Sequence, residues 1–502
     1  MCIPKLPLLG FAVIALFAVP ANAASLIVSN RMDSGPGSLR QAIMNANGNG
    51  EPDTITVNAG LSVQLVSPLP ALSDSDGTTI NGNGVVLDGS SAGAAASGLT
   101  ISGSNHRIES LDVRNFGGNG ILIIGAQNSV SACEIGLSGA NGGDGILVEA
   151  SAANAEVGEF NSGNIISGNG ASGIHILAQG VLIRGNLIGT NGDGAAGPGN
   201  ALGGIRIEGG SATVGGPTFG DGNIILSNGG SGIEVVDASG CVIEGNFIGV
   251  DVSGSGAAAN VGPGIRIENS SENTIGAAAG AGSNIIAANV GEGIVVTGAA
   301  SADNVIQANQ IGVDAFGGPL ANGLDGILID AGASNALIGG EVGADGNTIA
   351  NNGGFGVRVS GGAQTVSIRV NSIFANVAGG IDLAPGSNGD VAAPEILASK
   401  TLSGTALPQS TVDIYSDSTS QGKSILQTVT ATVFGQFTSN VDVASSPGLN
   451  FTATNTDLLG NTSEFSEPFS PGGEGEGEGE GEGEGEGEGE GEGEGEGEGE
   501  GE

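Results

Sequence analysis

Residues 172–190 have the sequence SGIHILAQGVLIRGNLIGT, and residues 203–216 have the sequence GGIRIEGGSATVGG. In both pieces, a Gly and an aliphatic residue, Gly173-Ile174 and Gly204-Ile205, are followed by one polar residue and a second aliphatic residue. The apolar runs are three to five residues long, which is too short for a helix, and Gly, Asn or Asp separates them. We therefore predict that each repeat holds three short strands.

The Gly-aliphatic start occurs ten times, at spacings of 24 to 33 residues. Its glycines are Gly120, Gly145, Gly173, Gly204, Gly232, Gly264, Gly293, Gly326, Gly356 and Gly380. A period of this size is typical of one supersecondary unit stacked on copies of itself. Alternate repeats are more alike, with double repeats of 59, 61 and 63 residues. The pattern predicts an all-β fold, a right-handed three-faced parallel β-helix of about 11 to 12 coils.

Asparagine recurs at one turn of the predicted coil. Asn186, Asn246, Asn309 and Asn371 occupy matching positions in every second coil, and Cys133 has the same position in an earlier coil. Stacked Asn side chains can hydrogen-bond along such a column. We expect a packing role for all five residues, with Cys133 as a small buried replacement.

The N-terminus predicts export from the cell. Residues 1–23 have the features of a signal peptide: Lys5, an apolar run from residue 6 to residue 19, and Ala21-Asn22-Ala23 as a cleavage site. The apolar run is too short to span a bilayer comfortably. We therefore expect a secreted or cell-surface protein that does not insert into a membrane once the signal is cleaved.

The rest of the chain divides into four parts. Residues 24–77 predict an N-terminal cap, where a short helix starting at Ser38 covers the open edge of the first coil. Residues 78–390 hold the β-helix. Residues 391–471 alternate apolar and polar residues and predict an antiparallel β-sandwich, which we expect to act as a stalk. Residues 472–502 form a Gly-Glu repeat, for which we expect disorder.

The chain is strongly acidic, with a formal net charge of −41. Fifteen Glu residues lie in the Gly-Glu repeat, so the remainder still has a net charge of −26. Nucleic-acid binding needs a basic surface, and anionic membranes attract basic segments. The composition therefore argues against both kinds of partner and fits a solvated extracellular protein or one that meets divalent cations. As partner we expect an extracellular polysaccharide or a cell-surface ligand.

The coil pattern resembles the right-handed parallel β-helix repeat family, the architecture of pectate-lyase-like proteins. The segment from Asn30 to Ala46 resembles a motif found before such repeats in bacterial surface and secreted proteins. Residues 391–471, which include Asn461-Thr462-Ser463-Glu464-Phe465, look like a bacterial Ig-like domain. The first resemblance covers roughly residues 26–383, and it implies a fold more specifically than it implies an activity.

The residue between the two aliphatic residues of each Gly-Ile strand should face outward. In the resembling enzymes, charged residues on one face of the β-helix form the active site. The resemblance thus implies a polysaccharide lyase or glycoside hydrolase, in which Arg is a base or binds a uronate and acidic pairs act as acid and base. The candidate catalytic residues are Arg206, Glu208, Glu234, Arg266 and Glu268. The candidate binding residues are His175, Arg358 and Asp330.

The same residues also predict a purely structural arrangement. Arg206, Glu234 and Arg266 alternate in sign on three successive coils, as in a ladder of cross-strand ion pairs. The polygalacturonase motifs of the family do not appear in order, and no Arg-x-Pro-x-x-Arg lyase motif is present. We therefore expect a non-catalytic protein that presents an extended face for adhesion or ligand binding, with the lyase or hydrolase as the alternative.

Metal ligands are sparse. His106 and His175 are the two histidines, and no Cys or His spacing suits zinc or copper. Asp251 and Asp314 occupy equivalent loop positions, with Asn191 before them, but such positions lie roughly 10 Å apart, too far to share one Ca²⁺. We expect no cofactor and no dedicated metal site; weak calcium binding by acidic loops is the alternative.

Overall fold

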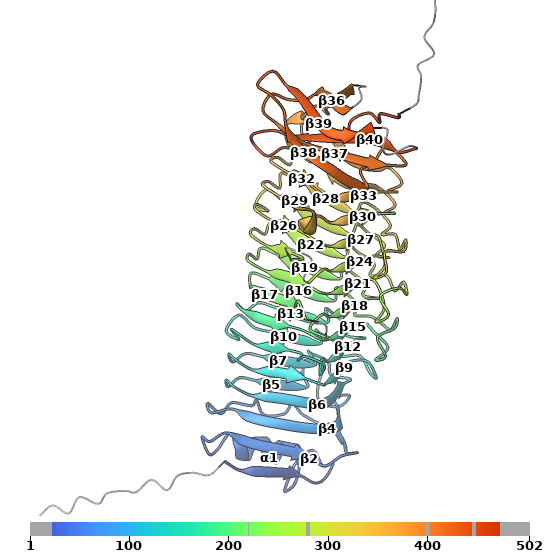
Figure 1. Cartoon of the computed structure of the whole chain (residues 1–502). Coiled ribbons are helices and arrows are strands. Elements are labelled where there is room, and N and C mark those ends of the chain that lie inside the picture. The colour runs from blue at the N-terminus through green and yellow to red at the C-terminus, as the bar shows by residue number, and fades with distance from the viewer. Residues whose placement is uncertain (1–22, 219, 278–281, 398–400, 444–447, 472–502) are drawn as a thin grey trace, which may run out of the picture.

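The computed structural model describes residues 23–471 except residues 219, 278–281, 398–400 and 444–447. Residues 1–22 of the predicted signal peptide and the Gly-Glu repeat lie outside the described residues. The described chain is nearly all β and forms a parallel solenoid of about 13 turns with antiparallel sheets at its C-terminal end (Figure 1). None of its helices is long and apolar enough to cross a membrane.

The solenoid begins before the first Gly-Ile repeat, which is why it has more turns than the repeat count indicates. Strand β1 pairs in parallel with β2, and both β2 and β3 pair in parallel with β4. These elements are β1 (Ser25–Val28), α1 (Leu39–Ala46), β2 (Asp53–Val57), β3 (Ser62–Gln64) and β4 (Thr78–Asp88).

The predicted N-terminal helix is confirmed as α1. Its N-cap is Ser38, whose side chain accepts a hydrogen bond from the backbone N–H of Gln41. Leu39, Ala42 and Ile43 are buried, and α1 contacts β1 and β2 (Figure 1). The helix therefore covers the first turn of the solenoid, as expected of a cap.

One face of the solenoid consists of the Gly-Ile strands, and we call it the Gly-Ile face. Its strands form a parallel 11-stranded sheet. They are β5 (Leu99–Ile101), β7 (Ile121–Ile123), β10 (Ile146–Val148), β13 (Ile174–Ile176), β16 (Ile205–Glu208), β19 (Ile233–Val236), β22 (Ile265–Glu268), β25 (Ile294–Thr297), β28 (Ile327–Asp330), β31 (Phe355–Val359) and β34 (Gly379–Leu383).

The other two faces belong to one 23-stranded sheet, because β4 and β6 (Arg107–Arg114) run across both. The second face contains β8 (Ser129–Ser131), β11 (Glu156–Val157), β14 (Val181–Ile183), β17 (Ala212–Gly215), β20 (Val242–Glu244), β23 (Thr274–Ile275), β26 (Val305–Ile306), β29 (Leu337–Gly339) and β32 (Ser367–Arg369). The third face contains β9 (Glu134–Ile135), β12 (Ile165–Ile166), β15 (Leu187–Ile188), β18 (Ile224–Ile225), β21 (Phe247–Ile248), β24 (Ile285–Ile286), β27 (Gln310–Ile311), β30 (Thr348–Ala350) and β33 (Ser372–Phe374).

The coils stack in register, so each inward residue lies on the same residue type of the next coil. Ile205 pairs with Ile233, and Ile233 pairs with Ile265, all fully buried. Burying one Ile side chain stabilises a fold by roughly 1.5–3 kcal/mol. The continuous aliphatic core between the three faces is therefore the main source of stability.

A ladder of asparagines runs along the turn between the second and third faces. The expected hydrogen bonding is confirmed, but the ladder includes each successive coil from Asn164 to Asn371, because residues from both halves of the double repeat alternate in it. Each side-chain N–H donates to the next side-chain carbonyl at 2.8 to 3.0 Å. The members are Asn164, Asn186, Asn223, Asn246, Asn284, Asn309, Asn347 and Asn371.

Cys133 ends this ladder, as its position in the sequence predicts. Its backbone N–H donates to Asn164 at 3.0 Å, and its thiol is buried, free, and accepts from the Leu111 N–H at 3.5 Å. Burial raises the pKa of the thiol to about 12, so Cys133 is an inert packing residue.

A second ladder lies at the turn between the third face and the Gly-Ile face, where the sequence analysis expected none. Its side-chain hydrogen bonds between successive asparagines measure 2.9 to 3.0 Å. Its members are Asn141, Asn169, Asn200, Asn228, Asn260, Asn289, Asn322, Asn352 and Asn376, and Gln421 of the C-terminal unit ends it.

The C-terminal unit consists of two three-stranded antiparallel sheets with a separate core, which confirms the antiparallel prediction. The sheets contain β35 (Glu395–Leu397), β36 (Thr401–Thr405) and β39 (Gln436–Asp442), and β37 (Thr411–Asp417), β38 (Ser424–Thr430) and β40 (Asn450–Thr456). The finer likeness to an Ig domain stays a prediction.

The C-terminal unit lies on the end of the solenoid as a second cap (Figure 1), and its expected role as a stalk stays a prediction. The last coil has no following coil to accept its N–H groups, so side chains of the unit do so. Ile368 donates to Thr462 Oγ1 at 2.9 Å, and Val370 donates to the Tyr415 hydroxyl at 3.2 Å. Two hydrogen bonds of 3.0 and 3.1 Å also join Arg369 to Asp413.

We predict that Asn223→Ala destabilises the protein strongly. Asn223 is fully buried, donates to Ile183 O and Asn246 Oδ1, and accepts from Asn186. Alanine leaves these buried partners unpaired, at about 1–3 kcal/mol for each group. Chemical denaturation should show a loss of at least about 2 kcal/mol, whereas the exposed helix variant Asn45→Ala should change stability by less than about 0.5 kcal/mol. Equal effects of the two variants would contradict a structural role of the ladder.

Candidate functional site

The outward residues of the Gly-Ile face form two adjacent columns, which together we call the charged column. The pairing register places His175 beside Arg206, Arg206 beside Glu234, and Glu234 beside Arg266. Glu208 and Glu268 lie in the adjacent outward column, with Val236 between them. The structure therefore brings the five candidate catalytic residues together, as the sequence predicts.

The charges of this column neutralise one another. Arg206 forms ion pairs with Glu234 of the next coil and, at 3.0 Å, with Glu208 of its own strand. Arg266 lies 2.9 Å from Glu268 and 3.9 Å from Glu234. The Arg206 guanidinium lowers the pKa of Glu208 through a hydrogen bond and its charge. Half-exposed ion pairs contribute about 0–1 kcal/mol each, so this ladder adds little stability.

The candidate binding residues do not form one site. His175 belongs to the ladder, with Asp144 and Glu208 each 3.4 Å from one of its ring nitrogens. Arg358 is separated from Arg266 by Val295 and Leu328, and it pairs with Asp382 at 3.2 Å.

Asp330, the third candidate binding residue, lies at the end of β28 beyond Thr297 in the adjacent outward column. It accepts a hydrogen bond from the Ser360 hydroxyl at 2.8 Å. It is therefore remote from His175, and the three candidates lie at different heights along the rod.

A groove that the sequence analysis did not identify lies on the third face, and we call it the third-face groove. Its floor is the outward column of this face, where Ile165, Leu187, Ile224 and Phe247 are neighbours in register. The groove has a volume of about 780 Å³. Residues 161–163, 216–218, 220 and 222 and Val252 also line it.

The lining of this groove is mostly glycine and aliphatic, with Asn161, Ser162, Thr218 and Ser283 as polar residues. A second cavity, of about 450 Å³, adjoins it and shares Ile165. There the outward column continues with Glu134 and Asp112, which pair in register.

Asp112 has an unusual environment. Its Oδ1 is buried without a hydrogen-bond partner, and Arg114 Nη1 lies 3.5 Å from its Oδ2. Burial and, secondarily, the nearby Glu134 charge raise the pKa of Asp112. Glu134 accepts a hydrogen bond from the Ser138 hydroxyl at 2.6 Å. One carboxyl with a raised pKa beside another is an arrangement that can serve as an acid–base pair.

A sequence signal for the floor was present. Each of its residues stands between a ladder Asn and a core Ile, as in Asn164-Ile165-Ile166. The position faces outward, yet it is apolar in successive coils. The sequence alone does not identify this floor, because an apolar pair at a turn does not show which of its two residues faces the solvent.

The equivalent loop acids hold their own turns. Asp251 Oδ1 accepts from the N–H groups of Ser253 and Gly256 at 3.0 and 3.1 Å. Asp314 Oδ1 accepts from Phe316 and Gly318 at 2.9 and 2.7 Å. Among the described residues, no group of three or more His, Cys, Asp or Glu side chains is arranged to hold a metal ion.

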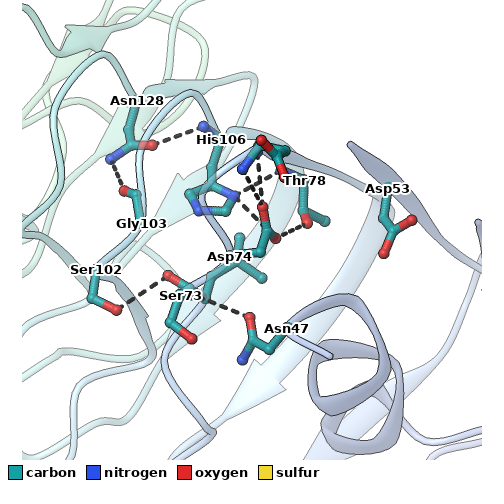
Figure 2. A network of polar contacts seen from close by, with 12 residues as sticks. Asn47, Asp53, Ser73, Asp74, Thr78, Ser102, Gly103, His106 and Asn128 are labelled. Carbon is teal, nitrogen blue, oxygen red and sulfur yellow. Dashed lines mark hydrogen bonds and ion pairs between the residues drawn. The ribbon is translucent and has the colours of Figure 1, made fainter. Parts of the chain in front are cut away.

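The other histidine, His106, lies in a buried network near the N-terminal cap (Figure 2). Its Nδ1 accepts a hydrogen bond from the backbone N–H of Thr78 at 2.8 Å. The Thr78 hydroxyl donates to Asp74 at 2.5 Å and not to the histidine. This combination of Asp, His and a hydroxyl is therefore a structural network, since the histidine does not activate the hydroxyl.

No family model matches the sequence, and no curated protein matches it. Among solved structures, the A-module of a mannuronan C-5 epimerase from Azotobacter vinelandii has 16% sequence identity and a TM-score of 0.42, covering 72% of this chain and 94% of its own. A periplasmic alginate epimerase has 15% identity and a TM-score of 0.38, covering 67% of this chain and 77% of its own. A surface adhesin of Streptococcus pneumoniae has 12% identity and a TM-score of 0.27, covering 89% of this chain and 99% of its own.

These proteins are β-helix proteins, and they include polysaccharide-acting enzymes as well as an adhesin. Their sequence identities of 16% or less transfer no residue role to this chain. The functional class of this chain therefore depends on the residues described above.

We predict that the two histidines titrate on opposite sides of the ordinary value of 6.5. Burial lowers the pKa of His106, so its stabilising effect is present above pH 6.5 and is lost as the pH falls below it. The hydrogen bond to Asp144 raises the pKa of His175, whose stabilising effect is present below pH 6.5 and is lost as the pH rises through the folded value.

Nuclear magnetic resonance of the imidazole protons measures both pKa values, and His175→Gln assigns the two signals. A His106 midpoint above that of His175 would show that the two environments are described wrongly.

Proposed function

We propose that this chain is an exported, non-catalytic β-helix protein that uses an extended face to bind an extracellular polysaccharide or another cell-surface ligand. The observation that supports it is the mutual ion pairing of the charged column. A general base or a uronate-binding Arg needs a free lone pair or a free guanidinium face. Arg206 and Arg266 are both held by carboxylates of the same column.

The shape of the solenoid supports the same function. Each coil presents the same surface positions as its neighbours at a spacing of about 4.8 Å, so a repetitive ligand can be contacted repeatedly along the rod. The acidic composition disfavours nucleic acid and anionic surfaces as partners. The predicted signal peptide supports a secreted or cell-surface location, and we propose no cofactor.

We predict that the protein binds polysaccharide without degrading it. A panel of neutral and uronic-acid polysaccharides should yield neither reducing ends nor unsaturated products after incubation with the protein. Degradation that is lost in Glu234→Gln and retained in Glu395→Gln, an exposed control in the C-terminal unit, would contradict the proposal and favour a lyase or hydrolase at the charged column.

A second candidate function is glycoside hydrolysis at Asp112 and Glu134. It is favoured by the pairing of these residues in register and by the raised pKa of Asp112, which suits a general acid, with Glu134 as the second carboxylate. This candidate uses other residues than the alternative derived from the sequence.

If hydrolysis is the function, Glu134→Gln and Asp112→Asn should each reduce the release of reducing ends by at least about 100-fold. Glu234→Gln should leave the rate unchanged, because the charged column lies on another face. A rate that neither Glu134→Gln nor Asp112→Asn reduces would exclude this candidate.

A further inference from the structure

We propose that the third-face groove is the ligand site, and that the ligand is an uncharged polysaccharide chain lying along the solenoid axis. This inference rests on the proposed function, since it names the site and the ligand class of a binding protein. It differs from the expectation drawn from the sequence, which placed any site on the Gly-Ile face.

The dimensions of the groove suit an extended chain. Ile165, Leu187, Ile224 and Phe247 belong to four successive coils, so the floor extends for about 14 Å along the axis. The volume of about 780 Å³ lies within the range of roughly 300–1,000 Å³ found for ligand pockets. A flat apolar floor with one aromatic ring can pack against the C–H faces of successive sugar rings.

The charges define the ligand class. None of the described residues that line the 780 Å³ groove is charged, although charged residues make up 13% of the chain. Recognition of a carboxylate or sulfate requires a free Arg or Lys. Arg184, next to Gly185 of the lining, is held by Glu156 at 2.5 Å and lies 3.5 Å from Asp221.

The adjoining cavity strengthens this conclusion. Asp112 and Glu134 would repel an anionic chain that extends from the groove, whereas carboxylates accept hydrogen bonds from sugar hydroxyls. Asn161, Ser162 and Thr218 supply neutral donors and acceptors at the wall of the groove. An uncharged polyhydroxyl chain suits both cavities, because the carboxylates do not repel it and its hydroxyl groups can hydrogen-bond to the polar residues of each.

The strand geometry argues against a peptide ligand. Strands β15, β18 and β21 of the floor are each paired on both sides, so none has a free edge for strand addition. A ligand along the axis crosses these strands and is contacted by side chains, not by the ladder hydrogen bonds.

Close backbone packing keeps the groove open. A Cβ on Gly163 would lie 1.7 Å from Gly185 O, and a Cβ on Gly222 would lie 1.9 Å from Gly245 O. No side chain larger than hydrogen fits at either position, so none projects over the floor from these two positions.

Affinity electrophoresis of the full chain tests the inference, with a soluble β-glucan, a galactomannan, a dextran or polygalacturonate included in the gel. We expect at least one uncharged polymer to retard the protein and polygalacturonate to leave it unretarded. Phe247→Ala should weaken the retardation at least tenfold. Phe316→Ala, which removes a phenyl ring that is 81% exposed on a loop outside the lining, is the matched control and should bind as the parent does.

Ser162→Trp is the second variant, because Phe247 also packs in a small cluster and its loss could disturb folding. Ser162 is exposed at the groove wall, so Trp should block the groove without altering the core. Retardation that survives Ser162→Trp overturns the groove as the site while leaving the binding function standing. Retardation by polygalacturonate alone overturns the ligand class. Retardation by none of the four polymers overturns this inference, whereas cleavage that depends on Glu234 overturns the proposed function.

Discussion

Every part of this structure depends on the in-register stacking of parallel coils. A coil cannot satisfy the backbone of its own strands or its buried Asn side chains, so these N–H and carbonyl groups must find their partners in the coil above or below. The two asparagine ladders show this dependence directly, since Asn186 and Asn223 are fully buried and joined by a 2.9 Å hydrogen bond. A coil out of register would leave a column of buried amides unpaired.

The same constraint accounts for the ends and for the loops. An end coil lacks one neighbour, and α1 at one end and the C-terminal unit at the other supply the missing cover or hydrogen bonds. Loops between the strands escape the constraint, so they vary in length from coil to coil. The third-face groove lies where such loops flank an apolar outward column.

The charged column and the groove differ in what they leave available to a ligand. In the charged column, Arg206 and Arg266 already have carboxylate partners, and a ligand would have to displace them. In the groove, the floor residues are only partly buried. Uncovered apolar surface in a concave site is therefore the stronger indication of binding.

The sequence by itself determined the repeat, the strands, the inward Ile columns and the alignment of His175, Arg206, Glu234 and Arg266, because a period-2 alternation and a constant coil spacing follow from local chain geometry. It also predicted the helix at Ser38 and one of the two asparagine ladders. Only the tertiary structure decided that Ile165 and Phe247 face outward, that the C-terminal unit caps the rod, and that Asp112 meets Glu134. These facts depend on which segments meet across coils and on where the loops fold, and no local pattern encodes such contacts.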